Sequence, residues 1–491
     1  MKQCEQFLHS SRIVNETVEL DEWMNTKNYP QFKEAFMFLE SIKTPGISHL
    51  SYIFGNAGEA CVIDPQLDIK TYLDIASTHQ CKITTVVETH RNEDFISGAL
   101  ALHKRTNAEV LHGKNADSTI QYADTVSDGD KRTIGAWEVS FIHTPGHTKD
   151  SICVVIRDKQ TAQSPCGVFT GDTLFVNDVG RTDFYPNEKE AMAGALFDSL
   201  QRLLSLGDDV IVYPAHGAGS VCGGGMADRE FTTLGVERKN NPMLQLESRD
   251  AFIDKKVNES HYIAPYFEAM EEANVSGVDA PWLPENLQPI IGNDYESWLD
   301  AETRPGHLID IRSHSAFRDQ HVKGSINLPG DLLSAYGGWL LNYDTPIAFV
   351  AQSFEEANDA AKQLWRMGFH NIAGFFSNIP MPITEEDKCM SHLSYITADV
   401  VKKRLEDEKN WVLLDVRKNE EVSATPLPGA IHTYLGYLKE KSESLNPDIS
   451  YTCMCGSGKR ATVAASYLRQ LGIKHVDVFN GSMQAWKDRY Y

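Results

Sequence analysis

The sequence predicts an α/β protein built from three domains. Its 491 residues are too many for one hydrophobic core of ordinary size. Short apolar strands alternate with loops and helix-like segments along the chain, as in α/β folds. In addition, a pattern that begins at residue 307 returns about a hundred residues later, which indicates an internal repeat of domain size.

The three domains are expected to cover residues 1–285, 286–385 and 386–491. The segment VSGVDAPWLPENLQPI, 275–290, is rich in Pro and turn residues and is the predicted linker after the first domain. NIPMPITEEDK, 378–388, marks the second break. Residues 1–29 carry no clear motif and are predicted to form an N-terminal arm.

The first domain places His and Asp side chains directly after short apolar strands. The strand in KITTVVETH ends at His90, and three later apolar runs are followed by loops that contain His147, Asp172 and His216. Such an arrangement suits a metal site, because the sheet fixes positions while the loops supply the ligands. A lone His is more often structural, but an ordered series of this kind predicts a metal site.

The series THRNED, TPGHT, GDTLF and YPAHG resembles the metallo-β-lactamase superfamily over this whole region. The resemblance implies an αββα sandwich. Hydrolases of this superfamily hold two zinc ions with an HxHxDH motif and later His, Asp and His residues. Here Asn92 and Phe95 replace the second and third His of that motif, so a complete two-zinc site is not expected.

The residues that remain are His90, His147 and Asp172. Two imidazoles and one carboxylate with open positions suit Fe(II) and O₂ chemistry. Persulfide dioxygenases of the superfamily use these motif positions for a single iron, and GRTDF at 180–184 resembles the same branch. The resemblance implies one mononuclear non-haem Fe(II) per chain, with Arg181 near the substrate. It also implies oxidation of a low-molecular-weight thiol persulfide by O₂ to sulfite and thiol.

Three neighbouring residues have other predicted roles. Asp94 is expected to accept a hydrogen bond that orients a ligand, although an isolated Asp could equally cap the following helix. His216 keeps the last His position of the superfamily and is predicted to lie behind the ligands or in the pocket wall. Cys222, in GAGSVCGGGMAD, could bring a thiol to the iron or to a persulfide, and a passive loop thiol is equally compatible with the sequence.

The last domain contains CMCGSGKR followed by ATVAASYLRQLGI, residues 453–473. Cys455 begins a tight loop that closes on Arg460 and leads into a helix, so backbone N–H groups and the helix N-terminus can stabilise an anionic sulfur. The alternative is a buried structural Cys. With LLDVR and PGAIH upstream, the loop resembles the rhodanese family of sulfurtransferases. The resemblance implies that Cys455 is the nucleophile that carries a persulfide, that Arg460 closes the anion pocket, and that the substrate is bound by Gly456, Ser457, Gly458 and Lys459.

The middle domain repeats this pattern without its chemistry. HLIDIR, KGSINLPG and LWRMGF match LLDVR, PGAIH and LRQLGI of the last domain. When the two copies are aligned on their helix ends, Ala351 stands opposite Cys455 and Glu356 opposite Arg460. We therefore expect two α/β rhodanese domains with parallel sheets, of which the first is inactive.

Net charge, apolar runs and cysteine usage exclude several classes of function. The formal charge of −22 disfavours a nucleic-acid partner, which needs clustered Lys and Arg. The sequence has no apolar run of about 18 residues for a membrane span, and its first residues lack the apolar region of a signal peptide. Nine Cys in scattered positions fit reduced thiols, so a cytoplasmic location is predicted.

The sequence thus predicts a bifunctional enzyme. The iron site would convert persulfide and O₂ to sulfite, and Cys455 would transfer sulfane sulfur to or from sulfite and thiosulfate. One alternative is a zinc-dependent thioester hydrolase of the glyoxalase II type fused to a sulfurtransferase. Another is a sulfur-carrier or redox-sensing protein with a degenerate metal domain. By resemblance, we also expect a homo-oligomer, either a dimer or a tetramer.

Overall fold

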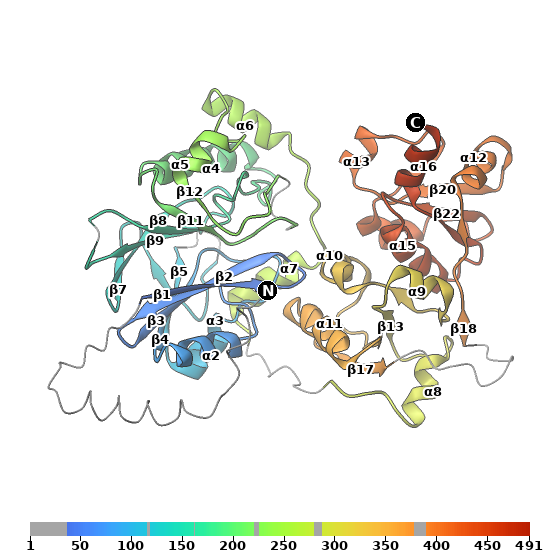
Figure 1. The fold of residues 1–491 in the computed structure, drawn as a ribbon, viewed down its shortest axis with the longest axis horizontal. Coiled ribbons are helices and arrows are strands. Elements are labelled where there is room, and N and C mark those ends of the chain that lie inside the picture. The colour runs from blue at the N-terminus through green and yellow to red at the C-terminus, as the bar shows by residue number, and fades with distance from the viewer. Residues whose placement is uncertain (1–36, 115–117, 162, 220–224, 279–286, 378–388) are drawn as a thin grey trace, which may run out of the picture.

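The computed structural model describes residues 37–114, 118–161, 163–219, 225–278, 287–377 and 389–491. These residues form a four-layer αββα unit followed by two α/β units with parallel sheets (Figure 1), which confirms the predicted fold class. The predicted arm, the break at 378–388, residues 279–286 of the predicted linker and Cys222 lie outside the described residues. The domain boundaries therefore stay predictions.

The first sheet of the αββα unit contains six strands that are adjacent in sequence order. The first three pair antiparallel, and the later ones pair parallel. Ala57 and Gly58 both have positive φ in the two-residue turn between the second and third strands, as hairpin turns of this length require. The strands are β1 (Phe38–Thr44), β2 (His49–Asn56), β3 (Glu59–Ile63), β4 (Lys82–Glu88), β5 (Glu109–Gly113) and β6 (Asp124–Val126).

The second sheet of this unit also has six strands, in the order β12-β11-β10-β9-β8-β7. Only the pair of β10 and β11 is parallel. The strands are β7 (Lys131–Ile134), β8 (Trp137–His143), β9 (Ile152–Asp158), β10 (Gly167–Gly171), β11 (Ile211–Pro214) and β12 (Thr232–Thr233).

Three hydrophobic clusters hold the four layers together. Phe54 and Val87 of the first sheet pack with Phe141 and Phe169 of the second in the central cluster. The outer helices cover the other faces of the sheets, and each buries its apolar side there. The helices of the unit are α2 (Lys70–Thr78), α3 (Ala99–Thr106), α4 (Lys189–Leu204), α5 (Leu234–Asn240), α6 (Arg249–Val257) and α7 (Phe267–Ser276).

The next unit has a parallel sheet with the order β15-β13-β16-β17. Its strands are β13 (His307–Asp310), β15 (Ile326–Asn327), β16 (Ile347–Ala351) and β17 (Ile372–Ser377), and a short β14 (His321–Val322) pairs with β18 (Met390–Ser391). Its helices are α8 (Asn293–Leu299), α9 (His314–Asp319), α10 (Gly330–Leu340) and α11 (Phe354–Arg366).

The last unit repeats this design with the order β19-β23-β22-β20-β21, again all parallel. Its strands are β19 (Tyr395–Ile396), β20 (Trp411–Asp415), β21 (Ala430–His432), β22 (Ser450–Met454) and β23 (Val476–Phe479). Its helices are α12 (Ala398–Asp407), α13 (Asn419–Ala424), the 3₁₀ turn η1 (Leu435–Tyr437), α14 (Leu438–Ser442), α15 (Lys459–Gln470) and α16 (Ser482–Tyr490).

Helix α10 lies where the three units meet (Figure 1). A Cβ on Gly338 would come within 2.1 Å of the Tyr266 ring of the αββα unit, and a Cβ on Gly436 of the last unit would come within 2.9 Å of Trp339. These glycines permit close approach of the three units. One buried cluster accordingly contains residues of all three, among them Tyr266, Trp339 and Tyr434.

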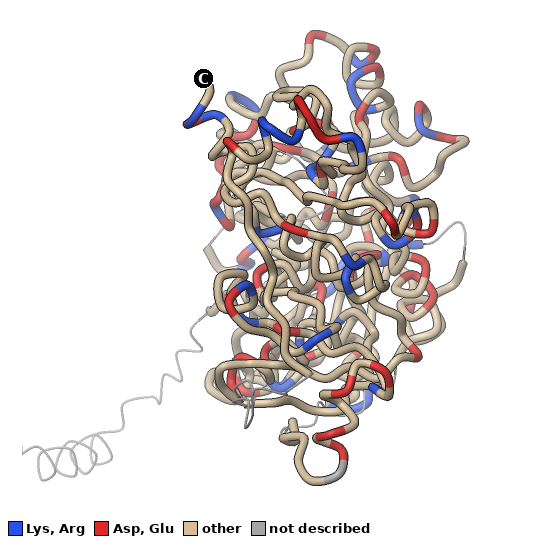
Figure 2. The backbone as a smooth tube through the Cα atoms, turned by 90° about the vertical axis from the view of Figure 1, so that its right-hand side faces the viewer, with Lys and Arg blue, Asp and Glu red and all other residues tan. Residues whose placement is uncertain are grey.

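The surface and the helices give two further observations. On the face of the rhodanese-like side drawn in Figure 2, Lys and Arg alternate with Asp and Glu and form no continuous basic stripe. None of the described helices combines the length and the apolar character that crossing a bilayer requires.

Candidate metal centre and cysteine loop

Three loops of the αββα unit bring the predicted ligands together. His90 follows β4, His147 lies in the loop after β8, and Asp172 directly follows β10. All three side chains are buried. The Nε2 atom of His147 lies 3.4 Å from Asp172 Oδ2, and Nε2 of His90 lies 4.0 Å from the same oxygen. Ligand atoms about 2.0–2.2 Å from one ion have such separations from each other.

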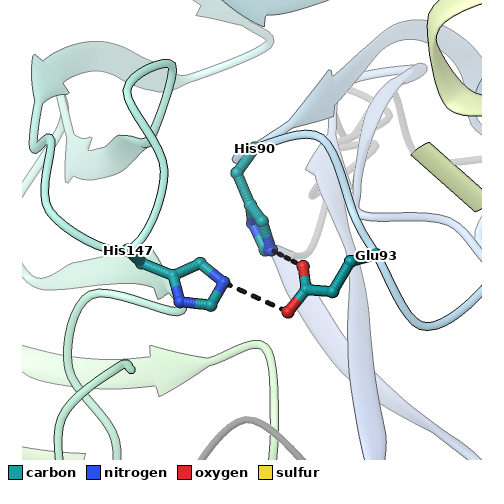
Figure 3. Close-up of side chains that lie close together, drawn as sticks. All are labelled: His90, Glu93 and His147. Carbon is teal, nitrogen blue, oxygen red and sulfur yellow. Dashed lines mark ion pairs between the residues drawn. The ribbon is translucent and has the colours of Figure 1, made fainter. Parts of the chain in front are cut away.

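Glu93 is a fourth member of this group that the sequence reasoning missed. Its carboxylate lies between the two imidazoles (Figure 3), 3.8 Å from Nε2 of His90 and 3.4 Å from Nε2 of His147. His90, Glu93 and His147 together suit a metal ion. The signal was present in the sequence as an extra carboxylate in THRNED, between Asn92 and Asp94.

Unpartnered buried atoms support metal binding here. The Nε2 atoms of His90 and His147 and Oδ2 of Asp172 are buried, and none forms a hydrogen bond among the described residues. Because buried polar atoms are almost always hydrogen-bonded, three such atoms directed at one point need a common partner. A cation satisfies all three, so the residues present fit a metal ion.

The other ring nitrogens fix the orientation of the two imidazoles. Nδ1 of His147 donates to the carbonyl of Arg181 at 3.0 Å. Nδ1 of His90 lies 2.9 Å from the hydroxyl of Thr89, and that hydroxyl donates to Asp64. Each Nδ1 therefore carries the proton, which leaves the Nε2 lone pair for a metal.

His216 is bonded to carboxylates on both sides. Its Nδ1 lies 2.7 Å from Asp172 Oδ1, and its Nε2 lies 3.0 Å from Asp94 Oδ2. Burial alone would lower the pKa of His216, but the two carboxylates raise it well above the usual value. The imidazolium thus holds Asp172 and Asp94 in place, as a hydrogen-bonding partner behind the ligands would.

A further buried residue near the site was not identified from the sequence. The ring of His49, from β2, packs on Phe95 at a centroid distance of 4.1 Å and lies 5.6 Å from the His216 ring. Its Nε2 has no hydrogen bond among the described residues. No motif signalled this His, because it sits inside the apolar run SHLSYIFG.

The Arg181 side chain is engaged within its own unit. Its Nε and Nη2 donate to the two oxygens of Asp183 at 2.6 and 2.8 Å, and its Nη1 donates to the carbonyl of Tyr262 at 3.1 Å. The guanidinium also lies 4.7 Å from the centre of the Phe184 ring. In this arrangement Arg181 contributes to the site through its carbonyl, and substrate contact by its side chain stays a prediction.

In the last unit, Cys455 lies between β22 and α15. The backbone N–H of Gly458 donates to Cys455 Sγ at 3.1 Å, and Ser482 Oγ accepts from the backbone N–H of Cys455. Gly458 has a φ of +108°, which favours glycine, and no side chain caps α15. The free N–H groups at this helix start are therefore available to an anion on the sulfur.

The loop carries two cations, and both are paired. Arg460 donates through Nη1 and Nη2 to Glu421 at 2.6 and 2.7 Å. Burial alone would lower the pKa of Arg460, but Glu421 raises it above the usual value, so the side chain stays charged. Lys459 Nζ lies 2.8 Å from Asp331, which belongs to the preceding unit. A Cβ on Gly456 would lie 3.4 Å from Arg460, so the loop passes close to this side chain.

The corresponding loop of the middle unit is closed by its own side chains. Strand register agrees with the sequence alignment, because Asp310 pairs with Val350 as Asp415 pairs with Met454, so Ala351 follows where Cys455 follows. Here Ser353 accepts from the N–H of Glu356, and Glu356 accepts from the N–H of Gln352. This capping arrangement occupies donors that an anion would need.

Cys453 and Cys455 lie two residues apart, and neither forms a disulfide bond with another described residue. Burial raises the pKa of Cys453 well above the usual value, which suits an inert core thiol.

Comparison with known families agrees with this geometry. The family described as the metallo-beta-lactamase superfamily matches residues 44–216. The family described as the rhodanese-like domain matches residues 294–377 and 397–489.

Curated relatives match less than a third of this chain in the two cases that follow. An uncharacterized protein of Mycobacterium leprae is 33% identical over 138 residues, 28% of this chain and 54% of the relative. The cytoplasmic hydroxyacylglutathione hydrolase of Arabidopsis thaliana is 34% identical over 149 residues, 30% of this chain and 56% of the relative. The chain spans about half the length of these relatives.

Two solved structures match larger shares of this chain. A metallo-beta-lactamase from Staphylococcus aureus is 29% identical, with a TM-score of 0.62 over 70% of this chain and 98% of the other. ETHE1 from Myxococcus xanthus is 30% identical over 49% of this chain and 99% of the other, with a TM-score of 0.43.

Proposed function

Taking the chain as a metallo-beta-lactamase superfamily domain joined to two rhodanese-like domains, we propose that it is a mononuclear non-haem Fe(II) persulfide dioxygenase coupled to a sulfurtransferase. The observation that carries the proposal is the convergence of three unpartnered atoms, His90 Nε2, His147 Nε2 and Asp172 Oδ2, on one buried point. Two imidazoles with carboxylates favour a single Fe(II) that keeps open positions.

Several features disfavour a second metal ion. Phe95 and Asn92 replace two of the usual His ligands, and both nitrogens of His216 are already bonded to carboxylates. The His216 ring lies between Asp94 and Asp172, so the three side chains already engage one another. One ion per chain is therefore proposed.

In the dioxygenase reaction, the balance is RSSH + O₂ + H₂O giving RSH and sulfite with two protons. Bound Fe(II) supplies the coordination and activation of O₂ and of the persulfide. The chain orients the imidazoles through the Arg181 carbonyl and the Thr89 hydroxyl, holds Asp172 through His216, and keeps bulk water away by burial.

In the sulfurtransferase reaction, the Cys455 thiolate attacks the sulfane sulfur of thiosulfate. A new S–S bond forms at Cys455, the S–S bond of thiosulfate breaks, and sulfite leaves with the bonding electrons. The reverse reaction passes sulfane sulfur to sulfite and gives thiosulfate. The loop N–H groups and the start of α15 stabilise the persulfide anion on Cys455. Sulfite made at the iron site is thus a substrate for Cys455.

The proposal is tested by O₂ uptake with the anaerobically iron-loaded full chain and several candidate persulfides. Sulfite and thiosulfate are quantified for the wild type and Cys455→Ser. Persulfide-dependent uptake is expected in both, with thiosulfate lost and sulfite accumulating in Cys455→Ser. No uptake with any persulfide, despite one bound iron per chain, would rule out the dioxygenase.

The metal site is tested by His147→Ala, with His143→Ala as its control. Removing the His147 imidazole should reduce bound iron from about one per chain to a small fraction and abolish O₂ uptake, because a ligand is lost. The Nε2 of His143 instead interacts with the Lys149 carbonyl, so the control should keep both its iron and its uptake. Equal iron content in the two variants would contradict the assignment of His147.

A second candidate is a zinc-dependent thioester hydrolase, favoured by the 34% identity to a hydroxyacylglutathione hydrolase. It requires two zinc ions per chain and hydrolysis of a glutathione thioester. Metal analysis together with a thioester assay distinguishes it from the dioxygenase.

The location of the protein is proposed from its sequence, and its assembly from the family resemblance. We propose a cytoplasmic enzyme that forms a dimer or tetramer and acts on small sulfur compounds, without nucleic-acid or membrane partners. Light scattering of the purified chain measures the assembly, and a monomer at micromolar concentration would contradict it.

A further inference from the structure

The loop that carries His90 and Glu93 is held from outside itself. This loop, residues 89–98, joins β4 to α3 and forms neither helix nor strand. All of its residues except Arg91 are buried. Buried backbone N–H and C=O groups need hydrogen-bond partners, and an irregular segment has no helix or sheet ladder to supply them. The partners of this loop therefore decide where its ligand side chains lie.

Asn274, in the last turn of α7, supplies three of these hydrogen bonds. Its Nδ2 donates to the carbonyls of Asn92 and Phe95 at 2.7 and 2.8 Å, and its Oδ1 accepts from the backbone N–H of Ser97 at 2.9 Å. The side chain is only 3% exposed. Both hydrogens and the oxygen of one buried amide are thus used on a single loop.

The two carbonyls that Asn274 binds lie on either side of the acidic residues of the loop. Glu93, between the two imidazoles, and Asp94, bonded to His216, are the two residues between them. Asn92 and Phe95 are also the positions at which this chain has no His. A side chain bound to a metal ion holds its loop in place. At these two positions the backbone is held by Asn274 instead.

The end of α7 is itself fixed to the metal domain. The backbone N–H of Gln121 donates to the Val275 carbonyl at 2.9 Å, and the Tyr122 hydroxyl lies 3.1 Å from the Asn274 carbonyl. These contacts join α7 to the segment before β6. The Asn274 amide therefore starts from a fixed position.

Other contacts hold the loop nearer to its ends. Asp64 accepts from the backbone N–H of Thr89 at 2.7 Å, and the Arg366 carbonyl of the middle domain accepts from the N–H of Ile96 at 2.8 Å. Neither contact reaches a backbone group of residues 92–95. Asn274 binds both ends of that stretch, so its loss should change the stretch more than the rest of the loop.

We propose that Asn274 is a positioning residue of the metal centre, which holds Glu93 and Asp94 in the arrangement that binds one Fe(II). The ligand concerned is a divalent cation, and Asn274 acts on it through the loop. This inference rests on the proposed mononuclear iron site. A loop already fixed in shape needs less ordering when the ion binds, and the affinity for the ion is higher for that reason.

The test measures the Fe(II) affinity of the full chain by competition with a chelator under anaerobic conditions. Asn274→Leu keeps the branched shape of the side chain and removes all its hydrogen-bonding groups. The affinity should fall by about 10–100-fold, the usual effect of losing a partner that orients metal ligands. Co(II) in place of Fe(II) gives a second readout. Its visible absorption bands depend on coordination geometry, and they should differ between Asn274→Leu and the wild type.

Asn327→Leu is the matched control in the middle domain. Asn327 is fully buried, and its Nδ2 also donates to two backbone carbonyls, those of Asp310 and Arg312, both at 3.0 Å. Loss of these bonds should lower the melting temperature much as Asn274→Leu does. The Fe(II) affinity should stay within about twofold of the wild type, because the substitution lies in another domain. The Co(II) spectrum should be that of the wild type.

Asn274→Ser keeps the test open if Asn274→Leu is unstable. Ser places no apolar group against the loop carbonyls and leaves room for a water molecule, so this variant should fold more readily. Its Fe(II) affinity should fall as well, because a water molecule bound to the loop does not tie the loop to α7 as the amide does. Thermal melting identifies the variants that are folded at the temperature of the assay.

The outcomes separate this inference from the proposed function. If the wild type binds neither Fe(II) nor Co(II), both are wrong. If it binds Fe(II) but takes up no O₂ with any persulfide, the dioxygenase is wrong, and a lower metal affinity of the Asn274 variants still supports the positioning role. If folded Asn274 variants keep the Fe(II) affinity and the Co(II) spectrum of the wild type, the positioning role is wrong. An equal loss of affinity in Asn327→Leu would also overturn it, because general destabilisation would then explain the result.

Discussion

At the scale of single residues, the metal centre depends on which ring nitrogen carries a proton. The Arg181 carbonyl and the Thr89 hydroxyl accept hydrogen bonds from Nδ1–H of His147 and His90. Both Nε2 lone pairs therefore face the same point. His216 holds Asp172 by its other oxygen. The ligand residues were predicted from the motifs, but these orienting partners, apart from Asp94 and His216, were not.

Glu93→Gln removes one negative charge between the two imidazoles and keeps the side-chain volume. We expect the affinity for Fe(II) to fall by about tenfold or more, because the carboxylate lies 3.4 and 3.8 Å from the ligand nitrogens and attracts a cation. Competition with a chelator under anaerobic conditions measures the affinity.

Glu271→Gln is the matched control for this prediction. It removes the same charge from a carboxylate that pairs with Arg91 at 3.3 Å and is not a member of the metal-ligand group. Its affinity for Fe(II) should stay within about twofold of the wild type. If both variants bind equally well, Glu93 has no part in metal binding.

At the scale of elements, the two rhodanese-like domains differ most in the turn between strand and helix. Four residues separate β22 from α15, and the last of them is a glycine with positive φ. Only two residues separate β16 from α11, and Ser353 and Glu356 cap the helix themselves. Helix capping and anion binding use the same N–H groups, so the middle domain gains stability at the expense of an anion site.

Ala351→Cys in the Cys455→Ser background should therefore not restore sulfurtransferase activity. A thiol would stand at the right position of the strand, but the turn is too short and its donors are occupied. Thiocyanate formation from thiosulfate measures the result, with the wild type as positive control. Activity above about 1% of the wild type would mean that the turn between β16 and α11 can bind an anion, which would contradict the prediction.

Acid sensitivity is expected in the middle domain because of His321. Burial lowers the pKa of this His to about 4, while its Nδ1 contacts the Phe317 carbonyl at 2.7 Å. In the unfolded chain the pKa is about 6.5, so between these values the unfolded state binds more protons. The free energy of unfolding should therefore fall as pH is lowered through this window, by about 2 kcal/mol at pH 5.

Urea unfolding at neutral and acidic pH measures this dependence. His321→Gln should weaken the dependence and leave part of it, because burial also lowers the pKa of His307 in the same domain to about 4. His475→Gln, an exposed His of the last domain, is the control and should keep the dependence of the wild type. An identical pH profile for His321→Gln and the wild type would show that another group is responsible.

At the scale of the whole molecule, α10 is the element that joins the three domains. Gly338 faces Tyr266 of the metal domain, Trp339 faces Gly436 of the last domain, and the Tyr336 ring lies 6.3 Å from the Tyr434 ring. The metal domain keeps its own central core of residues from both sheets, away from this helix. Docking of the domains and folding of the metal domain should therefore respond differently to changes in α10.

Gly338→Ala tests this separation. The added Cβ would lie 2.1 Å from the buried Tyr266 ring, so the helix or the ring must move, at a cost of about 1–3 kcal/mol. We expect a lower melting temperature and a larger radius of gyration in small-angle scattering, with the iron content unchanged.

Gly330→Ala is the matched control on the same helix. A Cβ at Gly330 would meet only the end of the Gln363 side chain, at 3.9 Å. Its melting temperature and radius should match those of the wild type. A loss of iron in Gly338→Ala equal to its loss of stability would indicate instead that the domains fold as one unit.

The sequence by itself determined the fold class and the repeat, and it predicted candidate residues for the two sites, because these follow from local patterns. Strand and helix periods, the His and Asp that follow strands, and the loop from Cys455 to Arg460 are all written in short segments. A short motif carries the same side chains at the same spacing in any protein, so its chemistry can be inferred without the tertiary structure.

Only the tertiary structure decided which distant side chains meet. Glu93 lies between two imidazoles from different loops, His216 between two carboxylates 44 and 122 residues away, and Tyr262 against a loop 157 residues later. These pairings depend on how two sheets and three domains pack, which is the sum of many weak apolar contacts. No local pattern records that sum, so the positions of Glu93, His49 and Tyr262 emerged only from the folded chain.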